Sequence, residues 1–281
     1  MNLGPRRQLT RAAICMVLAI ATTLALAACG GSDGDDEGPQ KLTFTLQGSG
    51  KESRFTAPKT AEAGLAEITL VNGSKKKEAL QLVRAEGKHS DQEVADGLKK
   101  AIEGKPLPGW FFAAGGVGPV PAGQLLTVTQ VLEPGTYYPF NAEAGTVKPK
   151  IIVKGEKSEE ELEASATVTA IDYGFEADQL PAGRAEIAFE NAGAQPHHIL
   201  AAPLIGDSTA EDVESFFKTE KGKAPLDEKS TQSTTVIEGG ESQLVTLDLK
   251  PGRYVLYCFI ADRQGGAAHA LKGMVDEVEV K

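Results

Sequence analysis

Most of the chain alternates between hydrophobic and polar residues over short stretches, beginning near Lys41. A period of two is typical of β-strands that bury one face, and these stretches are bounded by Gly, Pro, Asn or Lys. The strands predicted in the first half are 41–46, 66–72, 78–83, 124–132, 135–140 and 150–153. Those predicted in the second half are 165–173, 184–191, 198–202, 241–249, 252–260 and 274–280. Each half also contains one segment with helical periodicity, at 91–102 and at about 209–219.

The two halves repeat the same succession of elements. An Asn closes a similar strand in each half, EITLVN and EIAFEN, and each later hairpin turns at Pro-Gly. Each helix is predicted to begin with a capping box, formed by Ser90 with Glu93 and by Ser208 with Glu211. We interpret this repetition as an internal duplication.

The duplication predicts two domains, 41–153 and 165–281, joined by a charged linker at 154–164. Short alternating strands with one inserted helix favour an all-β fold class, namely two tandem Greek-key β-sandwiches. Alternation alone does not distinguish one family of sandwiches from another.

The N-terminal 28 residues form a different kind of segment. Arg residues precede a short apolar run that ends in small residues, which is typical of a secretory signal rather than a membrane span. The run ends in Leu-Ala-Ala-Cys29, which resembles a bacterial lipobox. The resemblance implies that 1–28 is a lipoprotein signal peptide and that Cys29 is lipidated after cleavage. The alternative is an ordinary secretory peptide with a Cys at its cleavage site.

The segment 29–40 that follows is Gly-rich, acidic and almost free of apolar residues, so we expect a flexible tether. The whole chain has a formal net charge of −10, which argues against a nucleic acid partner and against electrostatic adhesion to anionic lipid. The expected location is therefore extracytoplasmic, with the lipid alone anchoring the protein to a bacterial membrane.

Cys258 is the one thiol expected in the mature chain, because cleavage removes Cys15 and lipidation consumes Cys29. No intramolecular disulfide is then possible. A lone thiol in an oxidising compartment is expected to be either buried and inert or bound to a metal.

Potential metal ligands gather around this thiol in the sequence. His269 and Met274 follow Cys258, and a His197-His198 doublet follows Pro196 in the second half. Together they resemble the cupredoxins, the blue copper proteins, in which a Pro-His pair supplies one ligand and a C-terminal loop supplies Cys, His and Met in that order.

The resemblance implies two tandem cupredoxin-like sandwiches and one copper ion in the second. Its strong ligands would be Cys258, His269 and either His197 or His198, with Met274 as the axial ligand. Two imidazoles, a thiolate and a weak thioether hold copper in a geometry that suits both of its oxidation states. We expect the sulfur and the imidazole nitrogens to lie within about 4 Å of one another even without metal.

The chain departs from the family pattern in one respect. Ten residues, FIADRQGGAA, separate Cys258 from His269, whereas plastocyanin-like loops have two. The loop must leave the site and return, and Gly265 with Gly266 offers a turn for that return.

The first half does not carry the same ligand set. Aligning the repeats places Glu78 and Ala79 opposite the His doublet, Asn141 opposite Cys258 and Thr146 opposite Met274. We therefore expect the first domain to lack copper and to be a structural or partner-binding copy.

The leading hypothesis from the sequence is a lipid-anchored copper protein that carries one electron between partner proteins. No catalytic triad, phosphate-binding loop or His-Glu-x-x-His motif is found, so an enzyme is not expected. The alternatives are a metal-free cell-surface binding or scaffold protein with the same folds, and a protein that sequesters copper.

Overall fold

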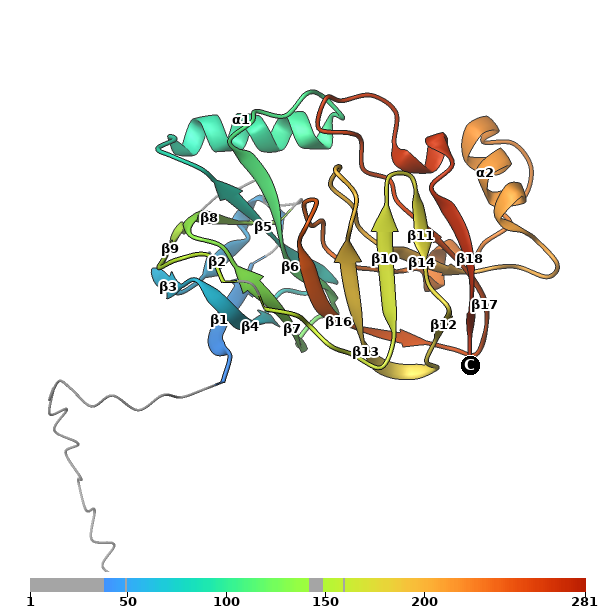
Figure 1. Cartoon of the computed structure of the whole chain (residues 1–281), viewed down its shortest axis with the longest axis horizontal. Coiled ribbons are helices and arrows are strands. Elements are labelled where there is room, and N and C mark those ends of the chain that lie inside the picture. The colour runs from blue at the N-terminus through green and yellow to red at the C-terminus, as the bar shows by residue number, and fades with distance from the viewer. Residues whose placement is uncertain (1–37, 49, 142–148, 159) are drawn as a thin grey trace, which may run out of the picture. The chain divides into compact units, whose positions relative to one another are not determined.

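The computed structural model describes residues 38–48, 50–141, 149–158 and 160–281 (Figure 1). The expected signal peptide, Cys29, most of the tether and Thr146 lie outside these residues. Within the described part, no helix is long and apolar enough to cross a membrane.

The described residues of the first half form nine strands and one α-helix, which Figure 1 labels. The strands are β1 (Gln40–Gln47), β2 (Arg54–Thr56), β3 (Thr60–Glu62), β4 (Gly64–Asn72), β5 (Glu78–Ala85), β6 (Phe111–Val120), β7 (Leu125–Leu132), β8 (Gly135–Phe140) and β9 (Ile151–Lys154). The helix α1 (Asp91–Ile102) lies between β5 and β6, and a short 3-10 helix, η1 (Gly50–Glu52), precedes β2.

The second half repeats this order with nine further strands and one helix. The strands are β10 (Thr167–Ile171), β11 (Gly174–Glu176), β12 (Gln179–Leu180), β13 (Gly183–Asn191), β14 (Leu200–Pro203), β15 (Gln232–Ser233), β16 (Ser242–Leu249), β17 (Gly252–Tyr257) and β18 (Val275–Val280). The helix α2 (Ala210–Thr219) lies between β14 and β15, followed by η2 (Glu228–Ser230), while η3 (His269–Lys272) precedes β18.

The sheet topology is the same in both halves. The first sandwich packs β2-β1-β4-β7 against β3-β9-β8-β5-β6, and the second packs β11-β10-β13-β16 against β12-β18-β17-β14-β15. In each half the first strand pairs in parallel with the fourth, β1 with β4 and β10 with β13. The expected all-β fold class, with two tandem sandwiches and one helix inserted in each, is confirmed. The boundaries 41–153, 154–164 and 165–281 stay predictions.

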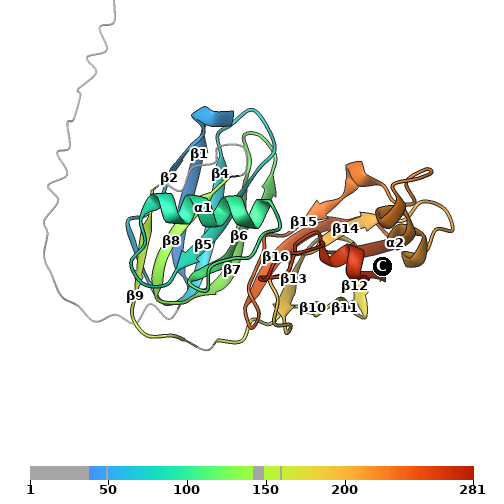
Figure 2. The same ribbon diagram turned by 90° about the horizontal axis from the view of Figure 1, so that it is seen from above.

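The two sandwiches share one sheet, because β7 pairs with β16 through Gln130–Gln243 and Thr129–Leu244 (Figure 2). Buried polar side chains reinforce this short pairing. The Nε2 of Gln243 lies 2.5 Å from the Oε1 of Gln130 and donates to the carbonyl of Gly116 at 3.1 Å. These amides satisfy one another, which a buried polar junction requires.

Each helix covers one apolar cluster. Val94 and Leu98 of α1 pack with Phe111 and Tyr138, and Val213 of α2 packs with apolar residues that include Tyr257, next to Cys258. The bounds predicted for α1 and its capping box, Ser90 with Glu93, are confirmed.

The capping box predicted for the second helix is wrong by one residue. The N-cap is Thr209, whose hydroxyl accepts from the backbone of Asp212, while the Ser208 hydroxyl donates to the carbonyl of Ile205 instead. Because Ser-Thr and Glu-Asp are adjacent pairs in this sequence, either register satisfies the capping-box pattern.

The sequence pattern does not predict strand β6. Its Gly-rich sequence, FFAAGGVGPV, lacks alternation. Gly115 and Gly116 have φ angles of 68° and 118°, and the register against β5 shifts twice. Irregular strands of this kind use glycine for their bulges, so the composition that suggests a loop here builds a strand.

Candidate metal centre

The turn that presents the His doublet is held by Asn191, the last residue of β13. Its side-chain Nδ2 donates to the carbonyls of Gln195 and Ile237, and its Oδ1 accepts from the amide of Gly193. The amide and carbonyl of His197 then exchange two hydrogen bonds with Ile237, both 3.0 Å long. The backbone of His197 is therefore fixed on both sides.

Strand β17 delivers Cys258, and the chain then leaves the site and returns. The return occurs at Gly265 and Gly266, whose φ angles of 78° and 121° favour glycine, as expected from the sequence. The amide of His269 donates to the carbonyl of Ile260, and the amide of Ala270 donates to that of Cys258, which closes the loop at its base.

The long loop packs on the first sandwich, which accounts for its length. The guanidinium of Arg263 pairs with buried Glu238 at 2.6 Å, donates to the carbonyls of Pro108 and Phe111, and stacks over Phe112 at 4.8 Å from the ring centre. The amides of Leu107 and Gly266 bridge the same two segments. The first sandwich thus supports the segment next to Asp262.

Three of the predicted ligands converge in the second sandwich. The Nδ1 atoms of His197 and His269 are 3.0 Å apart, and the Sγ of Cys258 is 3.6 Å from the Nδ1 of His269. All three donor atoms lie within 4.8 Å of one another, slightly more than the 4 Å expected. His197, Cys258 and His269 are each 0% exposed.

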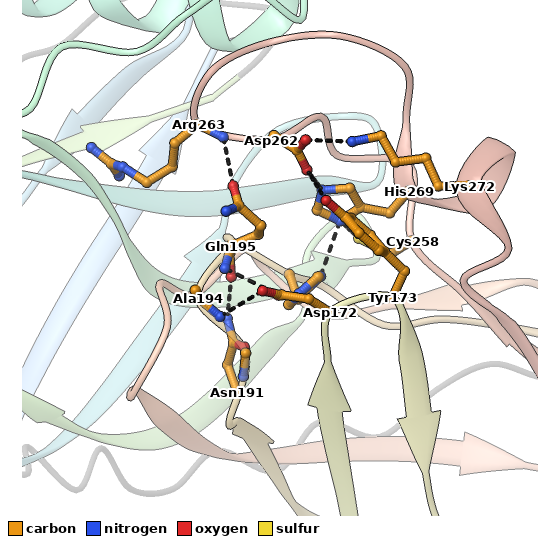
Figure 3. Close-up of polar contacts among 12 residues, drawn as sticks. Asp172, Tyr173, Asn191, Ala194, Gln195, Cys258, Asp262, Arg263, His269 and Lys272 are labelled. Atoms are coloured by element: carbon orange, nitrogen blue, oxygen red, sulfur yellow. Dashed lines mark hydrogen bonds and ion pairs between the residues drawn. The ribbon is translucent and has the colours of Figure 1, made fainter.

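Two carboxylates orient the imidazoles (Figure 3). The Nε2 of His197 lies 2.9 Å from the Oδ1 of Asp172, and the Nε2 of His269 lies 3.0 Å from the Oδ1 of Asp262. A carboxylate fixes the proton of each ring on Nε2 and leaves the Nδ1 lone pair free for a metal.

Each carboxylate is itself held in place. The backbone amides of Ala194 and Gln195 donate to Asp172. The hydroxyl of Tyr173 and the ammonium of Lys272 donate to Asp262. Burial alone would raise the pKa of both acids. The hydrogen bond of Asp172 with His197, together with those just described, outweighs burial and keeps each pKa below its usual value.

The histidines are neutral and the thiol is protonated when no cation is present. Burial lowers the pKa of His197 and brings that of His269 to about 4. Burial raises the pKa of Cys258 to about 11, although backbone amides of His198 and Ile260 donate to the sulfur and partly offset this. A soft cation is what would stabilise the thiolate.

The donor set fits one copper ion. Two Nδ1 lone pairs directed at each other across 3.0 Å repel unless a cation or a proton lies between them, and the nearby sulfur adds a soft third donor. Two imidazoles and one thiolate are the in-plane set of a blue-copper site. Among the described residues, this is the one group of three such donors.

The choice between His197 and His198, which the sequence left open, favours His197. The ring of His198 lies elsewhere, and its Nε2 accepts from the amide of Phe259 at 3.1 Å. Because Phe259 follows Cys258 in the chain, this bond fixes the backbone next to the thiol. The backbone of His198 also donates to the sulfur.

Met274 is 0% exposed and belongs to the same buried cluster as Cys258. Its amide donates to the carbonyl of His269 at 3.1 Å, at the end of η3. Its role as axial ligand stays a prediction, as does lipidation at Cys29, which lies outside the described residues.

Sequence reasoning missed the supporting residues Asp172, Tyr173, Asp262 and Arg263. The rings of Tyr173 and His269 pack edge to face, with centroids 5.2 Å apart. The Nζ of Lys272 lies over the Tyr173 ring, 4.7 Å from its centroid. One feature of the sequence could have indicated a functional role for two of these residues. Asp172 and Tyr173 form a polar pair at the end of a strand that otherwise alternates. Nothing in the sequence indicates which loop these residues would face.

The equivalent position in the first sandwich has a different chemistry. Asn141 donates to the Oε2 of Glu78 at 2.6 Å, and both residues are 4% exposed. The pair occupies the positions that alignment of the repeats assigns opposite Cys258 and His197. An amide and a carboxylate do not supply the soft donors that copper prefers.

No protein-family model matches this chain, and no curated protein matches it either. Among solved structures, it is similar to the dithionite-reduced auracyanin of Roseiflexus castenholzii, with 22% identity over 42% of this chain and 99% of that chain and a TM-score of 0.28. Auracyanin A of Chloroflexus aurantiacus, described as a "blue" copper protein, is 21% identical over 41% of this chain and 96% of its own, with a TM-score of 0.27.

A multi-copper oxidase from Pediococcus acidilactici is also similar, with 9% identity over 86% of this chain and 59% of that chain and a TM-score of 0.26. The expectation that this chain is not an enzyme stays a prediction.

Proposed function

We propose that this protein is an extracytoplasmic, membrane-anchored carrier of single electrons with a type 1-like copper site in its second sandwich. The observation that carries the proposal is the buried group of His197, Cys258 and His269, whose donor atoms lie within 4.8 Å of one another. A copper ion bound there would supply the Cu(I)/Cu(II) couple.

The protein residues prepare this site for electron transfer rather than for binding alone. Asp172 and Asp262 hold the two imidazoles in place, and the backbone of His197 is bonded on both sides to Ile237. Ligands that are fixed before the metal binds need little rearrangement when its charge changes. Burial of all three donors also excludes water from the centre.

A carrier is proposed in preference to an enzyme because the described residues contain a single group of this kind, with no exposed donor for a substrate. A redox partner protein, rather than nucleic acid, is the proposed second component, since the chain is acidic.

The test is a reductive titration of the copper-loaded protein with ascorbate, followed by reoxidation. We expect one electron per chain and reversible loss of the thiolate absorption. Copper that binds but does not cycle would instead indicate sequestration, and oxidation of added substrates with consumption of oxygen would indicate an enzyme.

The anchoring proposal gives a separate prediction. Cys29→Ser should move the protein from the membrane fraction to the soluble extracytoplasmic fraction, because the lipid is the proposed link to the bilayer. Fractionation with immunodetection measures this. Cys15→Ser is the matched control and should stay membrane-bound, since that residue is removed with the signal. A Cys29→Ser protein that still sediments with membranes would contradict the proposal.

A further inference from the structure

Strands β7 and β16 leave part of their facing edges unpaired. Their mutual pairing ends at Thr129–Leu244, yet β16 continues to Leu249 and β7 extends back to Leu125. In this region each strand has one neighbour, β4 for β7 and β13 for β16. Because β7 and β16 are antiparallel, the two open edges lie on the same side of their junction and face each other.

These two edges line one groove with a volume of about 700 Å³. Leu126 and Val128 of β7 and Val245 and Leu247 of β16 contribute to its walls. Leu125, at the end of β7, is 61% exposed. Open strand edges with apolar side chains favour the addition of another strand, and proteins normally cover or block them.

The groove is basic although the chain as a whole is acidic, with a net charge of −10. Its charged lining residues are the cations Lys77, Arg184, Lys229, Lys250 and Arg253 and the acids Asp227 and Asp248. Arg253 already pairs with Glu277, and Asp227 already accepts from the backbone amide of Lys229 and the hydroxyl of Ser230. Within the described part, the other four cations form no ion pair, so they are available to a ligand.

We propose that this groove binds an extended acidic peptide segment of a partner protein, as an added strand between β7 and β16. The backbone amide and carbonyl of Asp248 already bond the side chain of Gln232. The alternation of a strand leaves Thr246 of β16 and Leu125 and Thr127 of β7 with backbone groups that face the gap unpaired. An extended peptide satisfies these donors and acceptors, whereas a nucleic acid or a lipid does not. The four cations select acidic side chains on that segment. This binding site lies outside the copper group and does not depend on it.

The probe is a fluorescent peptide of alternating Thr and Glu, added to the full chain and followed by anisotropy. We expect saturable binding that weakens as salt is added, because part of the attraction is between exposed charges. The same peptide with N-methylated backbone amides should bind at least tenfold more weakly, because it keeps the charges but loses the donors that a strand needs.

The variant Lys229→Glu/Lys250→Glu should weaken binding of the unmodified peptide at least tenfold. The matched control is Lys59→Glu/Lys88→Glu, which makes the same change in net charge at exposed residues outside the groove and should leave binding unchanged. All four side chains are exposed, so circular dichroism should show an intact fold.

Three results would each overturn the proposal. They are no saturable binding at millimolar peptide, equal affinity for the N-methylated peptide, and equal weakening by the control variant. Equal affinity for a single-stranded oligothymidine would also count against it, since the groove would then be a general polyanion site.

Discussion

Replacing Cys258 by Ser should abolish the intense visible absorption of the copper-loaded protein while leaving the fold intact. That absorption arises from charge transfer between the thiolate and copper, so it requires sulfur at this position. Ser is of similar size and stays within the space of the 0% exposed thiol. Its hydroxyl is a poor ligand for copper, so affinity should also fall by more than about tenfold.

The measurement is an absorption spectrum of wild type and Cys258→Ser at equal copper loading, with circular dichroism as the check on folding. Met274 and both histidines remain in the variant, so any absorption that depends only on these residues would persist. A variant that keeps the same spectrum as wild type would exclude Cys258 as a ligand.

Substitutions of the two adjacent histidines, His197 and His198, should differ strongly in their effect on copper affinity. His197→Ala should lower copper affinity by more than about a hundredfold, because it removes a donor whose ring is already oriented by Asp172. His198→Asn should keep copper bound, because its ring accepts from Phe259 rather than reaching the centre, and the Asn oxygen can replace that acceptor. Competition against a coloured chelator measures both affinities.

The opposite pattern, with copper lost from His198→Asn and retained by His197→Ala, would assign the ligand to His198 and contradict the arrangement described above. Similar losses of copper affinity in both variants would mean that Asn does not replace the imidazole of His198 as the acceptor for the Phe259 amide. The variant His198→Gln would then test whether a longer side chain can accept that hydrogen bond.

The strands and helices with regular patterns could be predicted from sequence. The alternation along β4 and β16 reports directly on burial, and the capping box at Ser90 marks the first turn of α1. The pattern failed at β6, where bulges at Gly115 and Gly116 replace alternation. It also failed to predict that β7 and β16 join the sandwiches, because that pairing involves only two residues on each strand.

The donor residues could be recognised because their types are rare in this chain and their order follows a family pattern. The donor atoms of three of them, His197, Cys258 and His269, lie within 4.8 Å of one another. The supporting carboxylates could not be recognised, because Asp172 and Asp262 are two of many acids and only tertiary contact distinguishes them. The length of the loop after Cys258 follows from its contacts with the first sandwich through Arg263, and no residue pattern in the sequence indicates these contacts.

We predict that the second sandwich holds one preformed copper site built on Cys258. The test is a titration of the metal-free protein with Cu(II), followed at the same time by metal analysis and visible absorption. We predict a sharp endpoint at one copper per chain, with the intense thiolate band growing in proportion to bound copper. Binding of zinc with no uptake of copper, or copper uptake that produces no such band, would contradict the claim.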